Sequence, residues 1–412
     1  MSRLETNGYY ALGVPAYVAL GALEMALARR KGVTAYRFGD TLGNLSAGLG
    51  EVVLGLFLGP WLIALYDFGF AHLALVRWPE GSWIPWGLAF LAGDLGYYLY
   101  HRAGHRVAAL WAIHGVHHQT EEWNLSIAIR HPWFSDCYAA VFYAPLPMLG
   151  VPPTHFFFAI AVISFYAFTV HSNVFPRPSL YVLVTPATHL VHHARNRRYL
   201  NKNFGAMLNV WDRLFGTYAE VDPRDPPILG TTFGYGTHDG ARSQWIFFAR
   251  LAATARQAAT WQDRLRTWIM PPGWLPPGAH PVPVERARGD EAIPRAAKLY
   301  TGLQLTLTVA LALYVLWLRD AHPFWLLVAA SLVILASIST LGGLLDGRAS
   351  CARHELWRLG GAAALGGAMA CVPRYAPLGA AVLVVAAGSA LWVARARRTL
   401  EPQSFLSIAS PT

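Results

Sequence analysis

Histidines recur at helical spacing in three short segments of this 412-residue chain. The segments HRAGH, HGVHH and HLVHH hold His101 and His105, then His114, His117 and His118, then His189, His192 and His193. Residues three and four positions apart share one face of a helix, so each segment should aim two or three imidazoles in one direction. Eight nitrogen donors exceed the four ligands of a tetrahedral zinc site. They would suit two metal ions, with room left for oxygen or water.

The kind of metal does not follow from the ligands alone, because imidazole binds iron, zinc, copper and nickel. A site beside lipid chains, with no other reactive group in it, favours iron and oxygen. The zinc-protease signature HExxH is absent, since Arg102 and Gly115 stand where its glutamate would be. Clustered histidines could also sense pH, but a sensor does not need a repeated ligand spacing. The scattered histidines are better explained as hydrogen-bonded structural residues: His72, His155, His238, His280, His322 and His354.

Long apolar runs must position these segments. The chain is 54% hydrophobic and 14% charged, whereas a soluble protein of this size carries about a quarter charged residues. We therefore expect an all-α, polytopic membrane protein, in which a helical bundle carries a histidine-rich cap. The second span is long and could break near Gly59–Pro60, and Pro152–Pro153 should join the fourth and fifth spans as a hairpin. The candidate spans cover residues 9–28, 44–75, 82–100, 134–151 and 155–170, then 299–318, 324–345, 359–372 and 378–393.

The spans divide the chain into five expected regions. An interfacial helix should lie within residues 243–270, where aromatic residues and Arg mix at helical spacing. The regions are N-terminal spans over 1–82, a histidine-bearing catalytic domain over 83–222, a cytosolic interfacial helix and linker over 223–298, a C-terminal four-span transmembrane bundle over 299–395 and a tail over 396–412.

Charge sets the expected orientation and partners. The net charge of +10 comes mostly from Arg in short loops beside apolar runs, which indicates membrane topology and no nucleic-acid surface. Loops on the side of the histidines are richer in Lys and Arg, so the histidines should face the cytoplasm, at a bacterial inner membrane or the endoplasmic reticulum. The first run contains Glu24 and is expected to be a retained span, not a signal peptide. The three cysteines form no CxxC and indicate no disulfide framework.

The order of the histidine segments, flanked by spans, resembles the fatty acid hydroxylase superfamily, also called the sterol desaturase family. The likeness extends over most of the chain. A linker, PPGWLPPG, and a four-span tail containing GGLLDGRASCARHELWRL make the chain most similar to the branch that cleaves alkyl ether lipids. The likeness to this branch is also carried by the segments DLGYYLYHRAGH, WAIHGVHHQTEEWNLSIAIR and TPATHLVHHARNRRYLNKNFGAMLNVWDRLFGTY.

The resemblance implies roles for individual residues. The eight clustered histidines would be iron ligands, together with His171 in TVHSN, while Ala167 stands where some relatives carry a further histidine. Glu121 matches an acidic residue of the branch and would orient an imidazole or transfer a proton, although a solvated charge at a helix end explains it as well. Asp94, deep in apolar sequence, could accept a hydrogen bond from a ligating imidazole.

The implied activity is a membrane-bound di-iron oxygenase that uses O2 to hydroxylate a lipid C–H bond, cleaving an alkyl ether through a hemiacetal to an aldehyde. Two ferrous ions would be the cofactors, with electrons from tetrahydrobiopterin or another external donor. The same superfamily also leaves open a hydroxylase or desaturase of a sterol, fatty acyl, sphingoid or carotenoid substrate. A non-redox metal transporter or sensor is a third alternative. It is disfavoured because the last four spans carry almost no acid or histidine, apart from Asp346 and Glu355, which we expect in loops.

Overall fold

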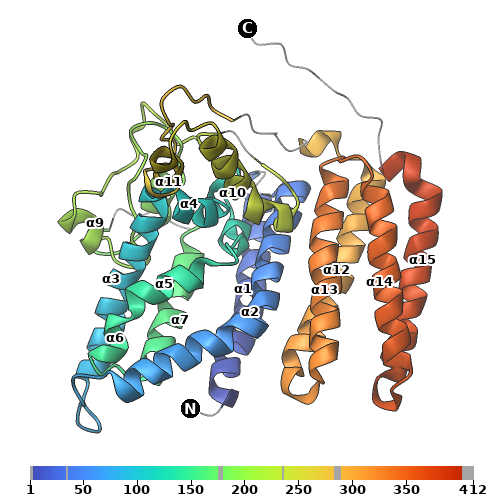
Figure 1. Cartoon of the computed structure of the whole chain (residues 1–412), viewed down its shortest axis with the longest axis horizontal. Helices are drawn as coiled ribbons and strands as arrows, with labels where there is room; N and C mark the ends of the chain where they lie inside the picture. The colour runs from blue at the N-terminus through green and yellow to red at the C-terminus, as the bar shows by residue number, and fades with distance from the viewer. Residues whose placement is uncertain (1–2, 34–35, 175–179, 234–235, 283–288, 401–412) are drawn as a thin grey trace. The chain divides into compact units, whose positions relative to one another are not determined.

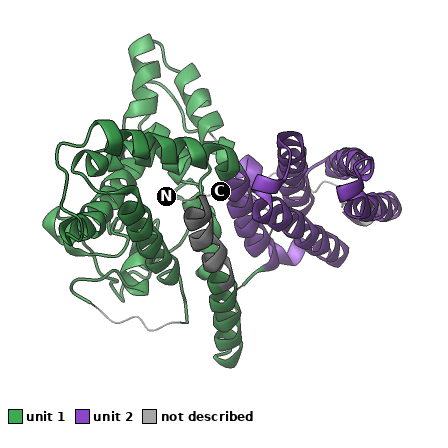
Figure 2. Ribbon diagram, turned by 90° about the horizontal axis from the view of Figure 1, so that it is seen from below, with its two compact units in different colours: residues 1–37, 54–236, 244–285 green, residues 38–53, 237–243, 286–412 purple. Residues whose placement is uncertain are grey.

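The computed structural model describes residues 3–33, 36–174, 180–233, 236–282 and 289–400. Within these ranges the regular structure is helical, with three isolated β-bridges and no strand, which confirms the all-α prediction. The helices fall into two compact units, which Figure 2 colours separately. Unit 1 comprises residues 1–37, 54–236 and 244–285, and unit 2 comprises residues 38–53, 237–243 and 286–412. Most of the last predicted region, the tail at 396–412, lies outside the described residues.

Unit 1 carries all the histidine segments. Its long helix α3 (Ile84–Arg106) packs along α7 (Pro153–Thr169), with small residues such as Ala89 and Ala159 buried where the helices meet. The helices α10 and α11 lie near α4 at the upper end of the unit in Figure 1. Its other helices are α1 (Arg3–Arg30), the second part of α2 (Phe38–His72), α4 (Ala108–His114), α5 (Ser135–Tyr143), α6 (Pro145–Met148), α8 (Pro186–His192), α9 (Val210–Leu214), most of α10 (Gly240–Arg256) and α11 (Trp261–Ile269).

Unit 2 is built from α12 (Arg295–Trp317), α13 (Phe324–Leu345), α14 (Cys351–Ala370) and α15 (Ala376–Leu400). Helices α14 and α15 pack closely where glycines leave room. A Cβ at Gly379 would come within 2.5 Å of the Gly366 carbonyl oxygen, so only a glycine fits there. Glu355 lies inside α14 and is fully buried, so the prediction that it sits in a loop was wrong. Its carboxylate pairs with Arg358 and accepts a hydrogen bond from Tyr300, which satisfies a charge among apolar helices.

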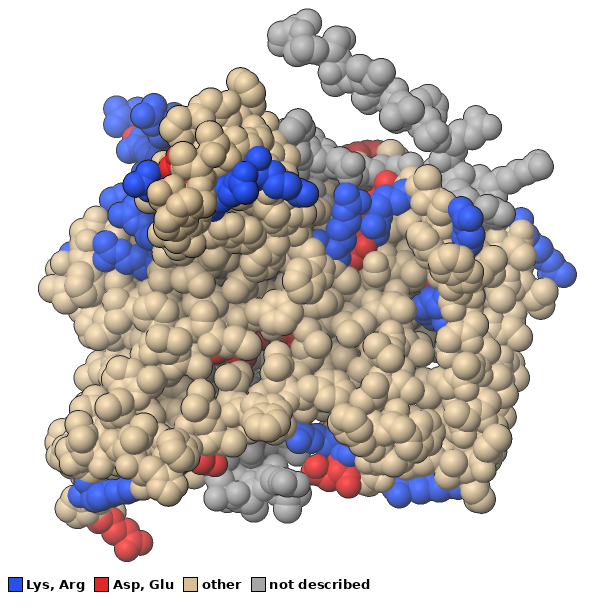
Figure 3. Space-filling view, viewed as in Figure 1, with Lys and Arg blue, Asp and Glu red and all other residues tan. Residues whose placement is uncertain are grey.

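Within the described part of the chain, four helices are long and apolar enough to cross a membrane: α2, α12, α13 and the segment Pro373–Ala396. Large apolar side chains on unit 2 are exposed, among them Trp317 at 77% and Val384 at 73%, as lipid-facing residues are. On the face drawn in Figure 3, Lys and Arg gather toward the ends of the helices and leave the middle mostly uncharged. The chain is an integral membrane protein.

Several predicted spans take a different form. The run 134–151 divides into α5 and α6 because Pro145 and Pro147 interrupt the backbone hydrogen bonding. Helix α2 continues through Pro60 and bends along its length instead of breaking (Figure 1). The span predicted from residue 359 starts earlier, at Cys351. The predicted hairpin at Pro152–Pro153 is present as a tight turn that starts α7.

Candidate metal centre

Local structure brings the histidine segments to one place. Helix α3 extends past the apolar run, so His101 and His105 occupy its last turns. Helix α4 ends at His114, and His117 and His118 follow in a 3-10 turn. Helix α8 starts with a capping box made by Thr185 and Thr188, has Pro186 at its first position and ends at His192. The start of the third segment is therefore fixed by its cap, and its histidines lie at the C-terminal end of α8.

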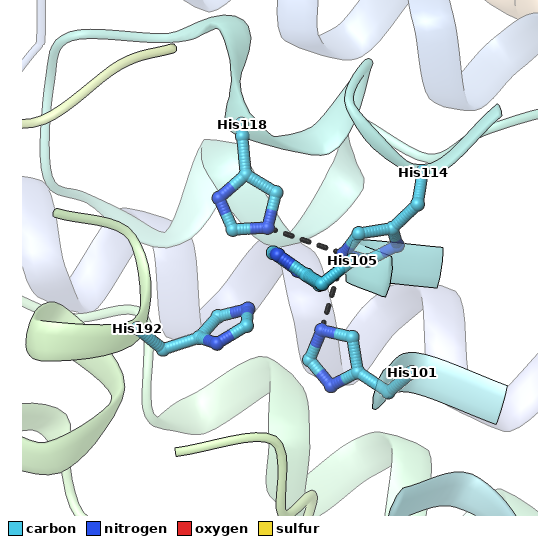
Figure 4. A group of neighbouring side chains, drawn as sticks. All are labelled: His101, His105, His114, His118 and His192. Carbon is cyan, nitrogen blue, oxygen red and sulfur yellow. Dashed lines mark hydrogen bonds between the residues drawn. The ribbon is translucent and has the colours of Figure 1, made fainter. Parts of the chain in front are cut away.

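Five of the predicted ligands form one group, drawn in Figure 4: His101, His105, His114, His118 and His192. Their potential ligand atoms all lie within 4.8 Å of one another, and the ring nitrogens turn toward a common space. The Nε2 atom of His114 lies 3.1 Å from Nε2 of His101 and 3.1 Å from Nε2 of His118. We call these residues the five-histidine group.

The other four predicted ligands form a second group: His117, His171, His189 and His193. All four side chains are buried. The Nε2 atom of His171 lies 2.9 Å from that of His189 and 3.2 Å from that of His117, and the Nε2 atoms of His189 and His193 are 3.2 Å apart. We call these residues the four-histidine group. His171, which stands alone in the sequence, completes it.

Each HxxHH segment contributes to both groups. In the first segment, His114 and His118 join the five-histidine group and His117 turns to the other. In the second segment the pattern is exchanged, since His189 and His193 join the four-histidine group while His192 turns away. Each segment therefore aims two imidazoles in one direction, as its spacing predicts, and each HxxHH segment turns its third imidazole toward the other group. The pair at i and i+4 shares a group, and the residue at i+3 supplies the neighbouring one.

The residues present fit two metal ions. Two ligands at about 2.1 Å from a metal, the usual distance for a histidine nitrogen, lie about 2.9–3.2 Å apart when their angle at the metal is about 90–100°. The Nε2 separations in both groups fall in this range. In addition, Nε2 of His105 and Nε2 of His192 are buried and have no hydrogen-bond partner among the described residues. A buried ring nitrogen without a partner is costly, and a metal ion would satisfy it.

Backbone carbonyls fix the orientation of several rings. Nδ1–H of His101 donates to the Phe204 carbonyl at 2.8 Å, and that of His192 donates to the Lys202 carbonyl at 2.9 Å. In the other group, Nδ1–H of His171 donates to the Ala167 carbonyl at 2.8 Å. A proton held on Nδ1 leaves the Nε2 lone pair free to bind a metal. Ala167 therefore contributes through its backbone carbonyl.

Buried carboxylates hold the loop that presents these carbonyls. Asp212 accepts hydrogen bonds from the backbone N–H groups of Phe204 and Gly205, both at 2.8 Å, and from Thr217 Oγ1 at 2.7 Å. Asp94 accepts from the backbone N–H of Met207 and from Trp211 Nε1. Asp94 was predicted to accept from an imidazole, and instead it holds the loop behind the imidazoles. These loop residues could not be predicted from the sequence, because a backbone carbonyl leaves no signature in the residue types.

Burial keeps the imidazoles neutral. It lowers the pKa of His192 to about 4 and the pKa of His171 to about 3. Burial and the neighbouring imidazoles hold other pKa values well below the ordinary histidine value, namely those of His114, His117, His118, His189 and His193. The neutral ring is the form that binds a metal, so little proton competition is expected near pH 7.

Glu121 lies outside both groups. Its side chain is 54% exposed and pairs with Arg195 Nη1 at 3.3 Å. Its neighbour Glu122 pairs with Arg37 at 3.3 Å. A proton-transfer role for Glu121 stays a prediction, since its carboxylate contacts a guanidinium and the histidine groups are formed without it.

The comparisons with known proteins agree with this geometry. The model of the fatty acid hydroxylase family matches residues 86–217, a range that contains all nine grouped histidines. The chain is 28% identical to the alkylglycerol monooxygenase of Danio rerio over 86% of this chain and 81% of that protein, and 28% identical to the alkylglycerol monooxygenase of Homo sapiens over the same shares.

A further relative matches a smaller part of the chain. The ornithine lipid hydroxylase of Rhizobium tropici is 31% identical over 39% of this chain and 48% of its own length. No solved structure matches the chain. Residues 86–217 therefore match the fatty acid hydroxylase family, and most of the chain is similar to alkylglycerol monooxygenases.

Proposed function

We propose that this protein is a membrane-bound di-iron oxygenase that hydroxylates a lipid C–H bond with O2, and that its substrate is an alkyl ether lipid. The observation that carries the oxygenase is the pair of buried histidine groups, inside the domain that matches the fatty acid hydroxylases. The ether-lipid substrate is supported by the similarity to alkylglycerol monooxygenases, which extends well beyond that domain.

The nine imidazoles would hold the metal ions, one ion in each group. When bound, two iron ions supply the activation of O2 and the oxidation of the substrate C–H bond. The chain contributes neutral ligands, which are fixed by backbone carbonyls and enclosed in a dry interior. An all-imidazole ligand set has no carboxylate among its metal-binding atoms, so protons for the reaction must arrive from groups outside it.

The reaction balances with an external donor. One oxygen atom of O2 is inserted into the C–H bond beside the ether oxygen, the other leaves as water, and two electrons and two protons come from the donor. The product is a hemiacetal, which collapses to a fatty aldehyde and a glycerol lipid. We propose a reduced pterin such as tetrahydrobiopterin as the donor, on the strength of the ether-lipid likeness, and a site that faces the cytoplasm, on the distribution of Lys and Arg.

A surface cavity beside the histidines is a candidate for the lipid headgroup. It has a volume of about 700 Å³ and is lined by residues that directly follow α8, among them Arg195, Arg197 and Arg198, and by Asp225. Arg195 is two residues from His193 and pairs with Glu121. Glycerol hydroxyls or a phosphate would find hydrogen-bond donors here. Glu121 would then act through Arg195, the cavity residue with which it pairs.

The test is metal content together with product analysis. The full chain is purified in detergent, loaded with ferrous iron without oxygen, and given an alkylglycerol and reduced pterin before oxygen is admitted. Two irons per chain and release of a fatty aldehyde are expected. His117→Ala and His192→Ala should each lower the iron content, whereas His354→Ala, an exposed histidine of α14, should not. No bound iron in the unaltered chain would refute the proposal.

A second candidate is hydroxylation of another membrane lipid without cleavage. The similarity to an ornithine lipid hydroxylase, 31% identical over 39% of this chain, favours it. Two bound irons with a hydroxylated lipid and no aldehyde would support this candidate against ether cleavage. Mass spectrometry of total lipid extracts after single turnover distinguishes the two products.

A further inference from the structure

One acidic side chain of the N-terminal helix is buried against the histidine-bearing loops. Glu24 of α1 has no exposed surface. Its Oε1 accepts hydrogen bonds from Ser172 Oγ at 2.7 Å and from the backbone N–H of Asn173 at 3.3 Å. Its Oε2 accepts from the backbone N–H of Leu125 at 2.8 Å and from the hydroxyl of Tyr36. A carboxylate is costly to bury, and here four donors compensate for the lost water.

The segments that Glu24 joins flank the four-histidine group. Ser172 and Asn173 directly follow His171. Leu125 ends the stretch that leaves His117 and passes through Trp123. The indole Nε1–H of Trp123 donates to the Ser172 carbonyl at 3.0 Å, which ties the two segments together a second time.

The Trp123 ring links this arrangement to the imidazoles. Its centroid lies 5.2 Å from that of His193, 5.6 Å from that of His171 and 6.0 Å from that of His189. Three of the four rings of the group therefore touch one indole, whose own position depends on the backbone that Glu24 holds. No such ring contact joins Trp123 to the five-histidine group among the described residues, so a disturbance at Glu24 should reach the groups unequally.

We propose that Glu24 is a positioning residue for the metal site of the four-histidine group. It acts from α1, outside the matched domain at residues 86–217, and fixes the backbone after His171 and the backbone around Trp123. The inference rests on the proposed two-metal function. The inference also gives the N-terminal helix a role beyond the membrane span predicted for it. Without Glu24, the loops of the matched domain on this side of the site would lose their support.

The experiment titrates the metal-free full chain in detergent with Co²⁺ alone, following visible ligand-field absorption and the number of ions bound. The unaltered chain and Met25→Ala, the exposed neighbour of Glu24, are expected to bind two ions. In Glu24→Ala one ion should bind as before and the second about 10–100-fold more weakly, the usual effect of losing an outer hydrogen-bond partner at a metal site. Glu24→Gln, which keeps one acceptor oxygen, should lie between.

The outcomes separate this inference from the proposed function. Two ions bound with unchanged affinity in Glu24→Ala would overturn the inference and leave the two-metal site standing. Equal weakening of both ions would overturn it too, because it would show a general loss of structure. If Glu24→Ala does not fold, Ser172→Ala removes a single donor, and an unchanged second ion in both Ser172→Ala and Glu24→Gln would overturn the inference. An unaltered chain that binds no Co²⁺ would overturn both proposals.

Discussion

Asp212 offers the sharpest test of how the loop at residues 202–217 supports the metal site. Its carboxylate is fully buried and accepts from two backbone N–H groups and from Thr217. In Asp212→Asn the carboxamide keeps one acceptor oxygen and turns an NH2 group toward a former donor. One buried donor then loses its partner, which costs about 1–3 kcal/mol, and the remaining bonds lose their charge assistance, at about 1 kcal/mol each. We expect the free energy of unfolding to fall by about 3–5 kcal/mol.

Asp212→Asn should also weaken metal binding, and only in one of the two histidine groups. Phe204, whose N–H binds Asp212, offers its carbonyl to His101, and Lys202 offers its carbonyl to His192, so both supported rings belong to the five-histidine group. Co²⁺ binding by that group should weaken about 10–100-fold, while the other group keeps its affinity. Thermal unfolding of the metal-free chain and a Co²⁺ titration give the two numbers.

The control for this experiment is Glu220→Gln, which makes the same charge change at an exposed position nearby. It should leave stability and metal binding unchanged. If Asp212→Asn lowers stability but both ions bind as before, the carbonyls of Phe204 and Lys202 do not set the ring positions. The reasoning from loop to imidazole would then be wrong, whatever the function of the site.

Three further predictions concern the groups themselves. His117→Ala and His118→Ala, adjacent in sequence, should each remove a different ion, so that their Co²⁺ spectra differ and the double variant binds neither ion tightly. Glu121→Gln should leave both ions bound, because the carboxylate lies outside the groups, and any loss of turnover without loss of metal would support its predicted proton-transfer role. The metal-free chain should lose stability in acid: the pKa of His192 is about 4 and that of His171 about 3 in the fold, so the unfolded chain takes up protons first. Its free energy of unfolding should be highest above about pH 6.5 and should fall as the pH is lowered toward 4. Thermal unfolding at a series of pH values would measure this fall.

Residue types and spacing were enough to find the grouped histidines as candidate ligands, because imidazoles at i and i+4 share a face in helical backbone. The division into two groups was not predictable in the same way. Helix α4 ends at His114, and His117 and His118 follow in a 3-10 turn, where rings at neighbouring positions point apart. That ending depends on tertiary packing: a Cβ at Gly115 would come within 2.9 Å of Phe247, a residue of α10 far along the chain.

Apolar runs predicted the positions of the helices better than the partners of the acidic residues within them. Helices α12 and α13 follow the expected spans within a few residues, since long apolar runs have few alternatives in a membrane. The acids were harder to place. Asp94 and Glu355 were assigned from hydropathy, which indicates that an acid is buried or near a loop and says nothing of its partners. Asp94 proved to bind backbone N–H groups and Glu355 a helix-borne arginine.

The three buried acids of unit 1 share one physical logic. Glu24, Asp94 and Asp212 each accept several hydrogen bonds, and each binds backbone N–H groups of segments that lead to a histidine or to a carbonyl that orients one. A carboxylate suits this task because it has two oxygens with several acceptor positions and no donor to satisfy. In a dry interior such charge-assisted bonds are strong, so a loop without regular structure can be held as firmly as a helix. The imidazoles then need no acidic partner of their own, and the negative charge stays one layer away from the metal-binding nitrogens. An acid-to-amide change at any of the three should therefore disturb the positions of the rings before it alters their charge.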